Sequence, residues 1–69
     1  MQDLERLIVM ANQIADNFSF HDDAVERTAD HLRRFWAPSM RERIAEHARG
    51  GGDGLNATAR AAVASLSVA

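Results

Sequence analysis

With 69 residues and a formal net charge of −2, the chain is long enough for one domain only, and such a short core commonly needs a further source of stability. It has no cysteine, which excludes disulfides, thiolate zinc sites, cysteine-ligated iron–sulfur clusters and a thiol nucleophile. All eight basic residues are arginine, but they are interspersed with acids and form no basic stripe of the kind that binds nucleic acid.

No apolar run approaches the length of a membrane span, and the first residues show no signal-type segment. We therefore expect a soluble, cytoplasmic protein without contact to a membrane. His21, His31 and His47 do not share one helix face at metal-ligand spacing, so we expect ordinary surface or cap histidines and no metal site.

The first part of the chain carries the clearest helical pattern. Apolar residues recur at three- and four-residue spacing, which predicts a helix over about residues 2–19: Leu4, Leu7, Ile8, Ala11, Ile14, Ala15 and Phe18. The middle of this helix is uncharged, although a solvated face normally carries charged pairs. Val9, Met10 and Gln13 are therefore candidates for partner contact, the alternative being ordinary scattered surface residues.

A second helix is predicted from Asp22 or Asp23 to about Trp36. Asp23 and Glu26 have the spacing of an acidic capping box. The inward positions repeat at helical spacing: Val25, Thr28 or Ala29, Leu32, Phe35 and Trp36.

Two shorter helices are predicted to follow. Pro38 ends the second helix, and Ser39 and Glu42 have capping-box spacing for a third helix over about 39–49, with Met40, Ile44 and Ala48 inward. The glycine-rich residues 50–54 are expected to form a flexible, unpacked linker. Asn56 is expected to cap a last helix over about 56–66, with a narrow inward stripe of Ala59, Ala62, Val63 and Leu66.

We expect this alanine-rich last helix to bury little, and to be the least stable element or one ordered mainly by another protein. No segment has the pattern of a strand. The predicted fold is thus all-α: a small single domain over residues 1–69 with three to four helices, an antiparallel helical hairpin followed by two shorter helices.

The corner between the second and third helices concentrates the residues that usually carry binding energy, including the only tryptophan and the only proline. We predict that its apolar part contacts a partner protein and that its arginines pair with acids or backbone carbonyls of that partner. The apolar part is Phe35, Trp36 and Met40, and the arginines are Arg33, Arg34 and Arg41. The competing interpretation places Phe35 and Trp36 in the core.

Other chemistries find little support in the sequence. His21 lies beside two acids that helix capping explains, so we expect no catalytic residues. The run at 50–54 follows a helix and lacks the lysine of a phosphate-binding loop. A helix-turn-helix-like DNA-binding or regulatory module is the alternative, although glutamates alternate with arginines in the helix that would read DNA.

Two segments together resemble a known family. They are Met10–Ala15 with Asn17 and Phe18, and Ala29–Trp36 with Pro38, Met40 and Arg41. The chain is similar here to the delta subunit of bacterial NAD-dependent, molybdenum-containing formate dehydrogenases, and the similarity continues through Gly54, Leu55 and Arg60–Val63. The family often has an acidic residue where this chain has Ala37 and a basic one where it has Ser39.

This resemblance implies a non-catalytic accessory subunit of a cytoplasmic complex that oxidises formate and reduces NAD. The implied partner is the large catalytic subunit, which the small chain would bind and stabilise, and whose molybdenum cofactor it would help to insert or retain. Molybdopterin guanine dinucleotide, iron–sulfur clusters, FMN and NAD are implied to lie in other subunits, with no cofactor in this chain.

Overall fold

The computed structural model describes residues 3–66, which form four helices and no strand. The helices are α1 (Leu4–Asn17), α2 (Ala24–Phe35), α3 (Pro38–Arg49) and α4 (Ala57–Leu66). The all-α prediction is confirmed, and the helix bounds lie close to those predicted. The predicted start of the first helix at residue 2 lies outside the described residues.

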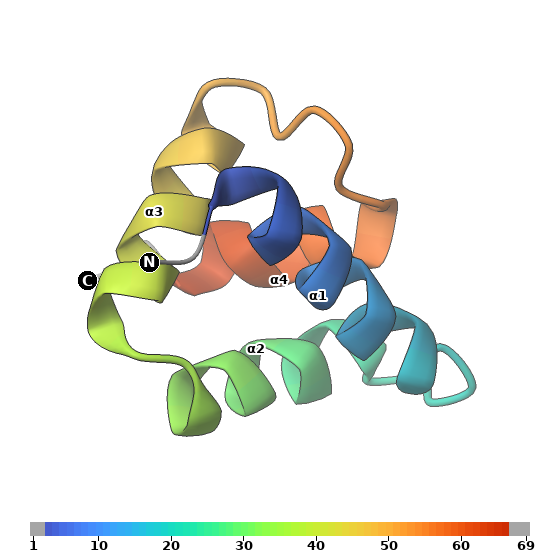
Figure 1. The fold of residues 1–69 in the computed structure, drawn as a ribbon. Helices are drawn as coiled ribbons and strands as arrows, with labels where there is room; N and C mark the ends of the chain where they lie inside the picture. The colour runs from blue at the N-terminus through green and yellow to red at the C-terminus, as the bar shows by residue number, and fades with distance from the viewer. Residues whose placement is uncertain (1–2, 67–69) are drawn as a thin grey trace.

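Helix α4 lies at the centre of the fold and contacts each of the other three helices (Figure 1). A short turn joins α1 to α2, yet α2 packs more extensively on α4 than on α1. Ala59, Ala62 and Val63 are fully buried, so the predicted inward stripe is confirmed. The expectation that this helix buries little is wrong, because small alanine side chains let three neighbouring helices approach it closely.

Side chains from all four helices and the last loop form the core. Its larger members are Leu7, Leu32, Trp36, Ile44, Leu55 and Val63. The one fully buried polar side chain among the described residues is Thr28, whose hydroxyl donates to the carbonyl oxygen of Ala24 at 2.7 Å. The buried hydroxyl is therefore satisfied within its own helix.

The glycine-rich connection between α3 and α4 (Figure 1) is exposed at Gly50, Gly51, Asp53 and Gly54, but part of it contacts the helices. Gly52 and Leu55 are buried. Gly52 has a φ of +65° and Gly54 a φ of +88°, conformations that residues with a side chain rarely adopt. A Cβ atom at Gly54 would lie 3.3 Å from Cγ2 of Ile8, so this loop also needs glycine for close contact with α1.

Asn12 of α1 holds this loop in place. Its Nδ2 donates to the carbonyl oxygen of Gly54 at 2.8 Å, and its Oδ1 accepts from the backbone N–H of Asn56 at 2.9 Å. Asn56 in turn caps α4 by accepting from the backbone N–H of Ala59 at 2.8 Å, which confirms the predicted cap. Its Nδ2 donates to Oδ1 of Asp16 at 3.2 Å, so two asparagines tie the start of α4 to α1.

Neither predicted capping box forms. Asp23 occupies the N-cap position of α2 without a side-chain cap bond, and its Oδ1 instead accepts from Nε of Arg27 at 2.7 Å. Helix α3 begins one residue earlier than predicted, with Pro38 in its first turn and Ala37 as N-cap. Ser39 therefore lies inside the helix, where its side chain cannot cap it.

Candidate partner-binding site

The corner between α2 and α3 has a fixed geometry. Trp36 is only 6% exposed, and its backbone N–H donates to the carbonyl oxygen of Leu32 at 3.0 Å. The carbonyl oxygen of Ala37 accepts from the N–H groups of Met40 at 3.0 Å and Arg41 at 3.1 Å. The buried indole thus anchors the corner and is a core residue, so it is not available as an exposed docking residue.

Phe35 is exposed, in contrast to the adjacent, buried Trp36. Its side chain is 71% exposed, so its predicted inward position is wrong. The helix ends at Phe35, and the extended backbone at Trp36 turns the indole into the core while the phenyl ring stays outside. The phenyl ring lies 4.7 Å from the imidazole of His31, measured between ring centroids.

Four rings form a continuous row from the α1–α2 turn to the corner, which we call the aromatic ladder: His21, Phe18, His31 and Phe35. The centroids of Phe18 lie 6.2 Å from those of both His21 and His31. Ring pairs at such separations attract one another. The ladder therefore gives the exposed Phe35 one ring neighbour, His31, and accounts for two of the three histidines.

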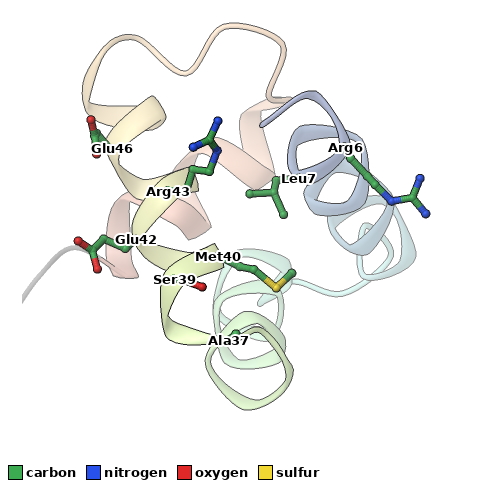
Figure 2. A pocket seen from close by; sticks show the side chains of 8 residues that line it. All are labelled: Arg6, Leu7, Ala37, Ser39, Met40, Glu42, Arg43 and Glu46. Carbon is green, nitrogen blue, oxygen red and sulfur yellow. The ribbon is translucent and has the colours of Figure 1, made fainter. Parts of the chain in front are cut away.

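A depression of about 790 Å³ lies between α1 and α3, and we call it the α1–α3 groove. Its lining residues are Arg6, Leu7, Ala37, Ser39, Met40, Glu42, Arg43 and Glu46. In Figure 2 the side chains of Leu7 and Met40 extend toward one another across its floor, while Arg6, Glu42 and Glu46 extend outward. The groove thus combines an apolar floor with a charged rim of both signs.

The α1 residues predicted to contact a partner lie beside this groove or outside it. Arg6, Met10 and Gln13 are spaced to lie along one strip of α1, but only Arg6 of the three lines the groove. Met10 is half-buried against the core and Gln13 is exposed. Val9 is 53% exposed on the outer side of the helix.

The arginines of the predicted corner do not act as one cluster. Arg34 pairs with Asp30 through a 3.0 Å contact, and both side chains are more than half exposed. Arg33 and Arg41 line a separate pocket of about 310 Å³, together with Arg49. Adjacent residues of the corner therefore point to different faces of the molecule.

The sequence-based prediction missed several contributors to these surfaces: Arg6 and Arg43 at the groove, Phe18 and His31 in the ladder, and Arg49 in the pocket. The four-residue spacing of His31 and Phe35 was a usable signal for their contact. The other residues come together only through the way the helices cross, which local periodicity does not determine.

Residues 3–66 hold no group of three or more acidic or histidine side chains placed to bind a metal ion. The pKa of Asp23 is lowered because Arg27 hydrogen-bonds its carboxylate, but this pair lies on the surface. Within the same range no helix is long and apolar enough to cross a membrane.

The DNA-binding alternative gains no support from the geometry. Helix α3 would be the recognition helix, and Glu42 and Glu46 line the groove beside Arg43 on it. Carboxylates at these positions would repel phosphates.

A family model described as the NADH-dependent formate dehydrogenase delta subunit, FdsD, matches residues 6–63, from the first turn of α1 to the middle of α4. No curated protein and no solved structure matches the chain significantly.

Proposed function

The chain belongs to the family of NADH-dependent formate dehydrogenase delta subunits, and on this premise we propose that it binds the catalytic large subunit of such a complex as a non-catalytic accessory subunit. The complex is cytoplasmic in this proposal. Molybdopterin guanine dinucleotide, iron–sulfur clusters, FMN and NAD lie in its other subunits. The absence of cysteine supports this division, since cysteine thiolates are the usual ligands of such clusters.

The observation that carries the proposal is the exposure of Phe35. Phe35 is 71% exposed at this corner, and its ring packs on that of His31, so part of its side-chain freedom is restricted before a partner covers it. Buried aromatic anchors are typical residues of high binding energy at protein interfaces. Phe35 is therefore the proposed anchor.

The α1–α3 groove supports the same assignment. Ala37 and Met40 line it two and five residues after Phe35, so the groove begins at the corner itself. Its floor of Leu7 and Met40 offers apolar area, and its charged rim is typical of the border of an interface. Met10 and Gln13 extend the contact along α1.

The test compares two exposed phenylalanines that differ in position. Phe20 is 93% exposed in the turn between α1 and α2, away from the corner, and so provides a matched control. We expect Phe35→Ala to lower the amount of large subunit that co-purifies with the tagged chain by about tenfold or more. Phe20→Ala should leave it unchanged.

Equal behaviour of the two variants would refute Phe35 as the anchor. If the unmodified tagged chain captures no large molybdenum-containing subunit from its native host, the accessory-subunit proposal itself fails.

We further propose that binding supports insertion or retention of the molybdenum cofactor in the large subunit. The complex purified without this chain should then contain less molybdenum per large subunit than the complete complex. Metal analysis of the two preparations measures this difference, and equal contents would limit the role of the chain to structural support.

A further inference from the structure

The pocket that contains Arg33, Arg41 and Arg49 lies where the end of α2, helix α3 and the end of α4 meet, and we call it the arginine pocket. Its remaining lining residues are Glu42, Ala45 and Leu66. Three arginines and one glutamate give the lining a formal charge of +2, from three positive charges and one negative charge, although the chain as a whole carries −2.

Of the three arginines, Arg41 has the environment that is least favourable for the stability of the fold. Its Nε atom is shut off from solvent and has no hydrogen-bond partner within residues 3–66. It also lies near the N-terminal end of α3, where the helix dipole disfavours a positive charge. A buried donor without a partner destabilises the folded chain, so both features act against stability.

The other two arginines have a structural explanation that Arg41 lacks. Arg33 and Arg49 lie in the last turns of α2 and α3, where a positive charge is favourable. Ion pairs in the described range engage Arg27 and Arg34 only, so none neutralises the three arginines of the pocket. Arg33 and Arg49 are exposed, so their guanidinium groups are open to an oxyanion from outside the chain, beside the half-buried Arg41.

We propose that the arginine pocket binds a carboxylate on an acidic segment of the catalytic subunit. Guanidinium groups pair with carboxylates through two parallel hydrogen bonds. Leu66 and Ala45 provide apolar wall for the stem of such a side chain, and Glu42 repels the single charge of a carboxylate less than the double charge of a phosphate. The net negative charge of the chain gives no long-range attraction to a polyanion such as nucleic acid.

This inference rests on the proposed function, but the pocket shares only Glu42 with the α1–α3 groove and Arg41 does not line the groove, so the two are tested separately. The variant is Arg41→Gln, and Arg27→Gln on the outer side of α2 is the control with the same change of charge. We expect Arg41→Gln to weaken binding of the large subunit about tenfold or more and to reduce its salt dependence. Its melting temperature should be no lower than that of the unmodified chain, because an unpaired buried donor has been removed.

A charge exchange identifies the partner group. Replacing the contacted Asp or Glu of the large subunit by Arg should weaken its binding to the unmodified chain. The same replacement should restore binding between the large subunit and the Arg41→Glu variant. If Arg41→Gln binds as well as Arg27→Gln while Phe35→Ala binds weakly, the pocket inference is overturned and the proposed function stands. A third outcome would overturn the choice of a carboxylate. In it, Arg41→Gln binds weakly, millimolar inorganic phosphate weakens binding of the unmodified chain to the same extent, and no acidic residue of the large subunit gives rescue.

Discussion

Replacement of Asn12 by alanine tests whether the glycine-rich loop is held from α1. The side chain of Asn12 makes two hydrogen bonds to this segment, at 2.8 Å to Gly54 and 2.9 Å to Asn56. A net contribution of about 0.5–1.5 kcal/mol for each bond predicts a loss of about 1–3 kcal/mol in the free energy of unfolding. A core of this size supplies roughly 3–5 kcal/mol, so the loss is a large fraction of the total.

The assay is thermal and urea unfolding of the isolated chain, followed by circular dichroism. The melting temperature should fall by about 4–8 °C for each kcal/mol lost. Gln13→Ala is the control, because Gln13 is the exposed neighbour on the same helix, and it should change stability by less than about 0.5 kcal/mol. Asn12→Asp should not rescue, since it places a carboxylate oxygen against the carbonyl oxygen of Gly54.

Equal melting temperatures for Asn12→Ala and Gln13→Ala would refute this reasoning. The loop would then be held by its glycine conformations and by the burial of Leu55 alone.

Three further predictions concern stability. Gly54→Ala should destabilise the chain by more than about 1 kcal/mol in urea unfolding, because φ is +88° there, whereas Gly50→Ala at negative φ should be nearly neutral. Trp36→Ala should cost about 3–5 kcal/mol and leave most of the chain unfolded by circular dichroism, whereas Phe35→Ala should melt like the unmodified chain. The pKa of Asp23 is lowered by the hydrogen bond from Arg27, so this ion pair stabilises the fold at neutral pH and the contribution declines as pH falls through the lowered pKa. The difference in unfolding between Asp23→Asn and the unmodified chain should therefore be larger at pH 6 than at pH 2.

Local periodicity was sufficient for the helices and failed where a helix ends. Phe35 follows Thr28 and Leu32 at helical spacing, which correctly places all three near one face of α2. Burial, however, depends on whether another element packs against that face at the same position along the helix. Thr28 and Leu32 are covered, and Phe35 in the last turn is not.

Composition misled the predictions for the last third of the chain. Glycines predict a flexible linker and alanines a weakly packed helix, yet Gly52 is buried within that linker and Ala59 is fully buried in the helix. The bonds that hold this segment join Asn12 to residues more than forty positions away. Such contacts depend on how the helices cross, and no local pattern contains that information.

The α2–α3 corner contains both a residue that stabilises the fold and residues proposed to contact a partner. Trp36 is buried in the core at this corner, Phe35 is exposed, and Arg41 lines the arginine pocket. A partner that contacts both Phe35 and Arg41 must therefore bind at the α2–α3 junction. A partner that binds only the folded chain stabilises it by about 2.7 kcal/mol when present at a hundred times its dissociation constant. That gain is comparable to what a core of this size supplies by itself, so binding of the proposed partner would offset the limited stability of a short chain without cysteine. Complex formation would therefore protect the whole fold, because α4 packs against every other helix and cannot detach without exposing the core that they share.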